Sequence, residues 1–140
     1  MNTRITIFSI FLLSLSFLKS QTFSDVMQSS GITTTNLSID GWGAGISFYD
    51  FNQDGWDDLS FAKGNSSQAI YINNQGSFQA SPILINNGFE TKMFLWVDYD
   101  NDGDLDIFIT TKHGKNHLYQ NDGNFVFADV TTNAGLYAGA

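Results

Sequence analysis

Two nine-residue segments of this chain carry the closely spaced oxygen side chains that a metal ion requires. They are residues 50–58, DFNQDGWDD, and residues 98–106, DYDNDGDLD. In both, carboxylate or amide side chains occupy alternate positions, a glycine follows the third of them, and an aspartate ends the segment. Carboxylates crowded into one turn repel each other unless a cation neutralises them, and Ca²⁺ prefers six to eight oxygen ligands. The two segments therefore predict a pair of Ca²⁺ sites.

Each predicted site takes its ligands from the same positions of its segment. Alternate residues of a tight loop aim side-chain oxygens inward, the glycine allows the sharp turn, and the residue after it offers its backbone carbonyl. The final aspartate closes the shell from the start of the next strand. Because these side chains include four carboxylates in the second loop and three in the first, we expect the second loop to bind Ca²⁺ more tightly. The predicted ligands are Asp50, Asn52, Asp54, Trp56 and Asp58 in the first loop, and Asp98, Asp100, Asp102, Asp104 and Asp106 in the second.

Short β-strands are expected on both sides of each acidic loop. The loops recur at an offset of 98 − 50 = 48, and the same shift carries Phe48 onto Trp96 and Tyr71 onto Tyr119. About four short strands in a repeat of roughly 50 residues is typical of a β-propeller blade. The sequence therefore predicts an all-β fold of four-stranded antiparallel blades, about two and a half of them. The expected strands are Ile46–Tyr49, Leu59–Ala62, Ala69–Ile72, Phe94–Val97, Leu105–Thr110 and His117–Gln120, with another aromatic strand after each third one.

A second match links the two ends of the repeats. Residues 23–26 with Gly31 and Ile32 reappear as residues 127–130 with Gly135 and Leu136, at an offset of 127 − 23 = 104, and an intervening copy near residues 78–89 is degenerate. Residues 26–30 are expected to form one turn of helix at most. Closed propellers typically use 4–8 blades, so we expect the start of a longer protein, with ring assembly from short chains as the alternative.

The N-terminal segment, residues 1–20, fits a secretory signal peptide. Residues 1–4 are positively charged, residues 5–18 are mostly apolar, and the small residue Ser20 precedes Gln21. The apolar run is shorter than the ~20 residues that a membrane helix needs, so no stable membrane span is expected. We therefore predict a signal peptide at residues 1–20, blade repeats at residues 21–140, and a secreted or cell-surface location.

Composition excludes several classes of function. The chain has 14 acidic residues, a formal net charge of −8 and no cysteine. The negative charge argues against nucleic acid as a partner, and the absence of cysteine excludes disulfides, thiolate metal sites and cysteine nucleophiles. No grouping of serine, histidine and acid rises above chance, and a saturated oxygen shell leaves no position for a substrate. No catalytic residue is predicted, and the expected role of the metal is structural.

Other readings of single residues are less favoured. An EF-hand would need helical flanks and a glutamate at the twelfth loop position, where Phe61 and Ile109 stand. His113 and His117 lie in a loop running into a strand, so they are expected to be polar surface residues rather than a zinc pair. The tryptophans at positions 42, 56 and 96 could form a sugar-stacking platform, but aromatic residues at repeating positions are more typical of a blade core.

The unit of strand, D-x-[DN]-x-D-G-x-x-D and strand resembles the FG-GAP or VCBS-type repeat, which is related to the Ca²⁺-binding blades of integrin α-chain propellers. Residues 118–125, LYQNDGNF, and residues 127–131, FADVT, also resemble this repeat class as it occurs in secreted bacterial proteins. The resemblance covers nearly all of the chain after residue 20. It implies a calcium-stabilised propeller outside the cell, with metal ligands at the positions named above. The blade count departs from the family pattern.

Two classes of function are compatible with this resemblance. The first is a binding module for adhesion, with an extracellular protein or a glycan as partner. The second is a non-catalytic scaffold within an extracellular polysaccharide-degrading enzyme. An enzyme needs a cleft with convergent acid, base or nucleophile residues, and this sequence supplies none. The sequence therefore favours the binding module.

Overall fold

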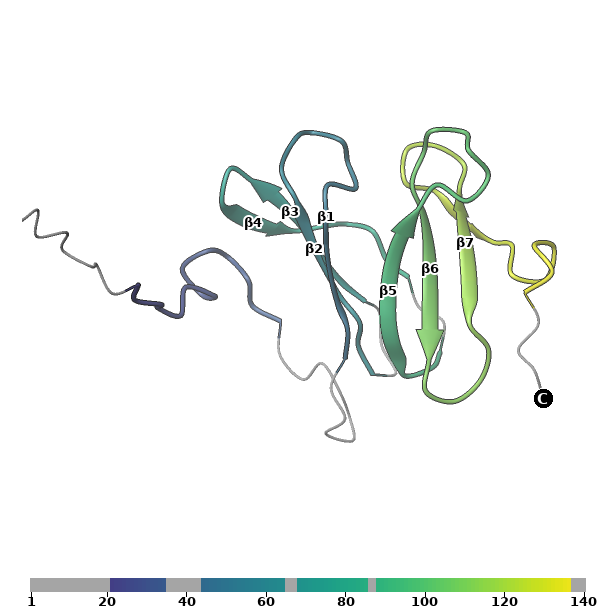
Figure 1. Ribbon diagram of the computed structural model, residues 1–140, viewed down its shortest axis with the longest axis horizontal. Helices are drawn as coiled ribbons and strands as arrows, with labels where there is room; N and C mark the ends of the chain where they lie inside the picture. Colours follow the sequence, from purple (N-terminus) through teal and green to yellow (C-terminus); the bar gives the residue numbers. More distant parts are fainter. Residues whose placement is uncertain (1–20, 35–43, 65–67, 86–87, 137–140) are drawn as a thin grey trace, which may run out of the picture.

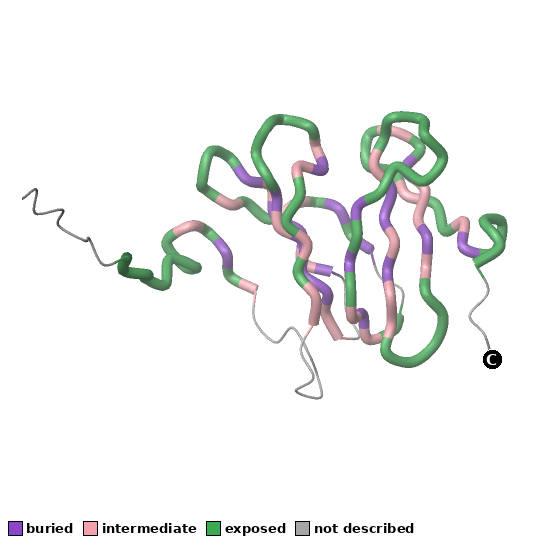
Figure 2. The backbone as a smooth tube through the Cα atoms, in the orientation of Figure 1, coloured by how far each residue is buried: buried purple, intermediate pink, exposed green. Residues whose placement is uncertain are grey.

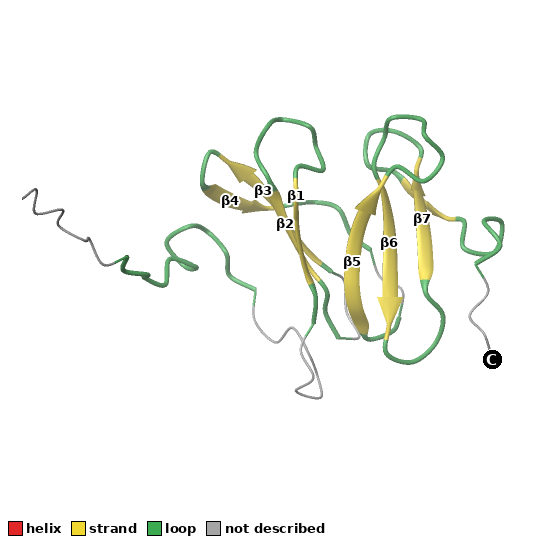
Figure 3. Cartoon of the chain, viewed as in Figure 1, coloured by secondary structure: helices red, strands yellow, loops and turns green. Residues whose placement is uncertain are grey.

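The computed structural model describes residues 21–34, 44–64, 68–85 and 88–136 (Figure 1). The predicted signal peptide lies outside these residues, as does Trp42. Within the described ranges all regular structure is β, as Figure 3 shows. No helix of this part of the chain is long and apolar enough to cross a membrane.

Eight strands form two four-stranded antiparallel sheets. The first sheet, here called the first blade, has the order β1-β2-β3-β4, and the second blade has the order β5-β6-β7-β8. This confirms the predicted all-β fold of blade-like sheets, and among the described residues the two blades do not close into a ring. The strands are β1 (Ile46–Tyr49), β2 (Asp58–Phe61), β3 (Ala69–Asn74), β4 (Ser77–Ala80), β5 (Thr91–Val97), β6 (Asp106–Thr111), β7 (His117–Asn121) and β8 (Phe127–Asp129).

The pairing register repeats with the same offset of 48 as the acidic loops. Leu59 pairs with Tyr71 in the first blade, and Ile107 pairs with Tyr119 at the equivalent place in the second. The fourth strands follow at an offset of 127 − 78 = 49, because the hairpin before β8 is longer by one position than the hairpin before β4. Thus Asn73 pairs with Phe78, and Asn121 pairs with Phe127.

The main hydrophobic core lies between the two blades. Along β5 the side chains alternate, so Phe94 and Trp96 are buried while Met93 and Leu95 face solvent (Figure 2). Trp96 stacks on Phe51 of the first acidic loop with ring centroids 4.4 Å apart. The same core contains Ile70, Ile83, Ile85, Ile107 and Ile109.

Backbone contacts fix the first blade beside the second. The Gly45 amide donates to the Lys92 carbonyl at 2.7 Å, and the Thr91 amide donates to the Lys63 carbonyl at 3.1 Å. A Cβ at position 45 would lie 2.7 Å from the Lys92 oxygen, so only glycine allows this approach. Both acidic loops therefore emerge at the same end of the two sheets, at the top of Figure 1.

The N-terminal described segment, residues 21–34, is a turn followed by one anchoring side chain. The Ser30 amide donates to the Val26 carbonyl at 2.8 Å, which agrees with the single helical turn predicted there. Ile32 is buried against Phe61 and Tyr71 of the first blade. The segment forms no strand, although its sequence matches residues 127–136.

Candidate metal centre

The two acidic loops connect β1 to β2 and β5 to β6, and they share one hydrogen-bonded frame. The Asp50 carboxylate accepts the Asp54 amide at 3.0 Å and the Gly55 amide at 2.8 Å. The Asp54 carboxylate in turn accepts the Trp56 amide at 2.9 Å. Every one of these bonds recurs at the offset of 48, with Asp98 accepting from Asp102 and Gly103, and Asp102 accepting from Asp104.

Glycine is needed where each loop reverses direction. Gly55 has φ +93° and Gly103 has φ +95°, values that residues with a Cβ rarely adopt. Two positions earlier, Gln53 and Asn101 also take positive φ, at 59° and 63°. The repeated positive φ values show that both loops use the same backbone path, so their side chains start from equivalent places.

The last aspartate of each loop is buried and anchors three segments of its blade. Asp58 accepts the Phe51 amide at 3.2 Å with one oxygen and the Asn73 amide of β3 at 2.7 Å with the other. Its exposed fraction is 1%, and that of Asp106 is 0%. Asp106 makes the corresponding bonds to the amides of Tyr99 and Asn121, at 2.9 and 2.8 Å.

Burial raises the pKa of both anchoring carboxyl groups above the ordinary value of 3.8. Desolvation is the largest cause, and the hydrogen bonds from the backbone amides only partly oppose it. Neighbouring carboxylates add repulsion that raises the pKa further, from Asp54 and Asp50 beside Asp58, and from Asp100 and Asp102 beside Asp106. A cation at these loops would favour the charged forms.

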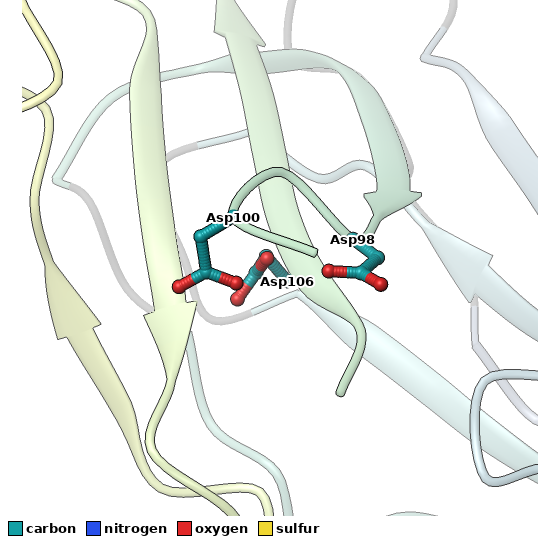
Figure 4. A group of neighbouring side chains, drawn as sticks. All are labelled: Asp98, Asp100 and Asp106. Atoms are coloured by element: carbon teal, nitrogen blue, oxygen red, sulfur yellow. The ribbon is translucent and has the colours of Figure 1, made fainter. Parts of the chain in front are cut away.

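Three carboxylates of the second loop converge. Asp98, Asp100 and Asp106 each place one oxygen so that the three lie within 4.8 Å of one another (Figure 4). Within the described ranges this is the one such group of acidic or histidine side chains. Asp102 is not a member of it, and its carboxylate is engaged by the Asp104 amide. The predicted ligands at the first, third and ninth positions of the second loop are thus brought together.

The first loop differs because an amide stands at its third position. Asn52 accepts the Asp54 amide at 3.0 Å and donates from its own side-chain nitrogen to the Asp54 carboxylate at 3.1 Å. In the second loop, Asp100 instead accepts a 2.6 Å hydrogen bond from the Gln120 side chain on β7. The first loop therefore satisfies part of its charge internally, whereas the second loop presents three carboxylates to one point.

The donor set of the second loop fits a hard cation. All three groups offer carboxylate oxygens, and a separation of up to 4.8 Å suits oxygens that lie ~2.3–2.6 Å from a central Ca²⁺. None of the loop carboxylates forms an ion pair with a lysine of the described residues. Among the described residues, no lysine therefore neutralises the negative charge that is concentrated at the loops.

Comparison with protein families agrees with this geometry. The family model for the FG-GAP-like repeat matches residues 50–109 and, again, residues 98–140, which together make up more than half of the chain. The chain belongs to the FG-GAP-like repeat family. Each match begins at the first aspartate of an acidic loop, so the FG-GAP-like repeat starts where the candidate ligands start. A search of curated proteins finds no match to the chain.

The structure corrects two expectations about aromatic residues and histidines. Trp96 is in the core as predicted, but the prediction is wrong for Trp56, which lies in the acidic loop and is 46% exposed. His117 is only partly exposed: it stacks on Tyr119 and Phe89, and its Nδ1 lies 3.2 Å from an Asp129 oxygen. His113 is exposed as expected.

Sequence reasoning missed two glutamines of this FG-GAP-like repeat pair. Gln120 holds Asp100, and its equivalent in the first blade is Ile72, so a polar residue replacing an apolar one was the available signal. Gln53 donates to the Gly103 carbonyl at 3.1 Å and joins the two loops. No pattern in the sequence indicates that second contact, because it depends on how the blades pack.

Proposed function

We propose that the chain is a secreted or cell-surface binding module in which Ca²⁺ holds the acidic loops of FG-GAP-like blades. The observation that carries the proposal is the convergence of Asp98, Asp100 and Asp106 without a neutralising lysine among the described residues. Bound Ca²⁺ would supply positive charge at this point and so stabilise the loop. The second loop would be the tighter site, and the first loop, with Asp50, Asn52, Asp54 and Asp58, would be the weaker one.

The proposed role of the ion is structural. One of the proposed ligands, Asp106, also accepts hydrogen bonds from the Tyr99 and Asn121 amides. Binding of the ion would therefore also hold the edge of the blade in place. A rigid loop edge would then present the exposed surface to its partner. The partner class that we propose is an extracellular protein or a glycan, because the net charge of −8 disfavours nucleic acid.

Thermal unfolding of residues 21–140 in millimolar calcium and in chelator tests the proposal. Ligand at a hundred times its dissociation constant stabilises a protein by about 2.7 kcal/mol, which corresponds to a rise in Tm of roughly 10 °C or more for a chain of this size. Magnesium at the same concentration is the control, and it should give a smaller rise because it keeps its water shell. Equal melting temperatures in calcium and in chelator would refute the proposal.

Two further measurements test location and partner. Mass spectrometry of the exported protein should show an N-terminus near Gln21. A glycan array probed in calcium and in chelator should show binding that depends on the metal. Glycan binding that persists in chelator would show that recognition of the partner does not depend on the metal.

A further inference from the structure

A polar hollow lies between the two acidic loops and the β7–β8 hairpin, residues 122–126. Its volume is about 210 Å³. None of the three carboxylates that converge in the second loop lines it, so the polar hollow is separate from the candidate metal centre. The residues that offer it polar groups are Asn52, Gln53, Gly103, Asp104, Asn121 and Asn124.

One residue of the polar hollow has a buried oxygen without a hydrogen-bond partner. Asn121 is 3% exposed, and its Oδ1 accepts no hydrogen bond from the described residues. Its Nδ2 donates to the Leu105 carbonyl at 3.3 Å. At the equivalent place in the first blade, Asn73 Oδ1 accepts the Gly76 amide at 2.7 Å. Because a buried acceptor without a donor destabilises the protein, the second blade lacks a partner that the first blade supplies from its own hairpin.

The hairpin of the second blade carries an aromatic ring where the first blade has a glycine. Phe125 precedes Phe127 by two positions, just as Gly76 precedes Phe78. Phe125 has φ +59°, which is rare for a bulky residue and which glycine adopts without strain. Its ring meets Phe51 edge-on with centroids 5.6 Å apart and stays 38% exposed. The strained turn therefore leaves part of an aromatic ring free beside the polar hollow.

Phe125 also lines a second hollow, which is mostly apolar. This apolar hollow has a volume of about 190 Å³, and Pro82 and Ile83 form part of its wall. The two hollows share Phe51, Asn124 and Phe125, so they meet at these residues. Together they make a groove between the blades with one apolar half and one polar half, here called the interblade groove.

The polar half of the interblade groove carries negative charge and accepts hydrogen bonds. The Asp104 carboxylate has no hydrogen bond or ion pair among the described residues, and one of its oxygens lies 3.8 Å from the place that a Cβ on Gly123 would take. The Gly103 carbonyl and Asn121 Oδ1 are two further acceptors. In the part of the chain that the structure describes, no lysine lines either hollow. A matching ligand has a cationic donor at one end and an apolar stem at the other.

We infer that the interblade groove binds a primary alkylammonium group. An ammonium offers three separate donors, which suit the acceptors of Gly103, Asp104 and Asn121, and its methylene stem would cover the ring of Phe125. A guanidinium is a planar fork that suits a single bidentate carboxylate, so it fits three separate acceptors less well. A neutral polyol would leave the charge of Asp104 unpaired. The inference goes beyond the proposed function and does not require a bound metal.

Titration followed by nuclear magnetic resonance tests the site. The ¹⁵N-labelled chain from Gln21 onward is titrated in millimolar calcium with n-butylammonium chloride at constant ionic strength, and 1-butanol and glucose are the neutral controls. The side-chain amide signals of Asn121 and Asn124 should shift saturably, with an affinity at least about tenfold above that for either control. No saturable shift, or equal binding of a neutral control, overturns the inference.

The same titration in chelator separates this site from the proposed metal site. The shifts should appear both in calcium and in chelator, because the groove and the convergent carboxylates are separate. Shifts that appear only in chelator would place the ammonium at the metal position and overturn the inference. The melting temperatures in calcium and in chelator test the proposed function independently, so either idea can fail alone.

Two substitutions test the polar and the apolar half. Asp104→Asn keeps the backbone carbonyl and should weaken n-butylammonium binding by about tenfold. Asp57→Asn removes the same charge from an exposed residue outside the groove and should leave binding unchanged. Phe125→Gly should weaken binding without lowering the melting temperature by more than a few degrees, because glycine relieves the strained φ. Equal losses in the two aspartate variants, or full binding by Phe125→Gly, overturn the inference.

Two further ligands distinguish the source of the ammonium group. Nα-acetyl-lysine amide represents a lysine side chain of a protein partner, and putrescine represents a free diamine. Tighter binding of the blocked lysine supports a protein source, and tighter binding of putrescine supports a free amine. Failure of both to compete with n-butylammonium overturns the inference.

Discussion

The two acidic loops have the same backbone but treat their negative charge differently. In the first loop the side-chain nitrogen of Asn52 donates a 3.1 Å hydrogen bond to the Asp54 carboxylate and so stabilises part of its negative charge. In the second loop Asp100 joins Asp98 and Asp106 in a group whose oxygens lie within 4.8 Å. The two loops thus differ by one atom at the third position, an amide nitrogen in Asn52 and a carboxylate oxygen in Asp100, and only the second loop has a group of three carboxylates that could hold a metal ion.

The comparison shows that the hydrogen-bonded backbone of a loop does not depend on the number of carboxylates that the loop brings together. The backbone bonds of Asp58 and Asp106 are equivalent, and both carboxyl groups are buried with raised pKa values. These bonds stabilise the fold in either blade. We expect the residue at the third loop position, Asn52 or Asp100, to set how much a bound cation adds to that stability.

The largest effect is expected from removing the buried anchors. Asp106→Ala and Asp58→Ala each leave two backbone amides without their acceptor, which should cost about 2–4 kcal/mol in chelator. In calcium, Asp106→Ala should lose more than Asp58→Ala, because only the second loop has the three-carboxylate group. Urea unfolding in both conditions measures this. Asparagine at either position keeps only one of the two oxygen acceptors, so it should lose less stability than alanine but more than the parent chain. Calcium-dependent losses of equal size in Asp106→Ala and Asp58→Ala would contradict the comparison.

Exchanging the residues at the third loop position should reverse the order of the calcium affinities of the two loops. Asp100→Asn should weaken calcium binding at the second loop by about tenfold, or about 1.4 kcal/mol, and Asn52→Asp should strengthen the first loop by a similar factor. Calorimetric titration of each variant and of the pair gives the ranking. If the order of affinities is unchanged in the double variant, carboxylate count does not explain the difference.

A smaller effect is expected from the glutamine that holds Asp100. Gln120→Leu removes a 2.6 Å hydrogen bond and should weaken calcium binding at the second loop by about 0.5–1.5 kcal/mol. Gln79→Leu, on the exposed part of β4, is the matched control and should leave the titration unchanged. A loss of equal size in both variants would mean that the effect is unspecific.

The smallest effect concerns the pH dependence of stability and the contact between His117 and Asp129 in the second blade. Burial by itself would raise the pKa of Asp129, but hydrogen bonds from Thr131 and His117 outweigh it and leave the pKa below 3.8. The unfolded chain therefore binds the proton more readily, and the stabilisation is present above about pH 3.8 and is lost as the pH falls through the lowered pKa.

Asp129→Asn removes this stabilisation, so the difference in melting temperature between parent and variant should shrink as the pH falls below that value. Ala80 stands at the equivalent place in the first blade, which has no such pair among its described residues. Ala80→Asn is therefore a control whose effect should not change with pH. A difference for Asp129→Asn that stays constant down to the lowest pH would contradict the assignment.

Much of the fold follows from the sequence because its signals are local and repeated. Strand β1 has the predicted bounds, and the loops keep their φ pattern because Gly55 and Gly103 impose it. The grouping of Asp98, Asp100 and Asp106 follows from their spacing in one loop. The exposure of Trp56 and the partial burial of His117 could not be predicted, because they depend on how the loops pack and on the stack of His117 with Phe89, which no spacing encodes.

The contact from Gln53 to the Gly103 carbonyl has a consequence for the array as a whole. It joins the first loop to the second, so an ion bound at the second loop, as proposed, would also restrain the first. If both loops bind a metal ion as proposed, occupancy of one site would lower the entropic cost of filling the other. Metal uptake along such a row of blades would become cooperative, and a single side-chain amide would set how far the order spreads.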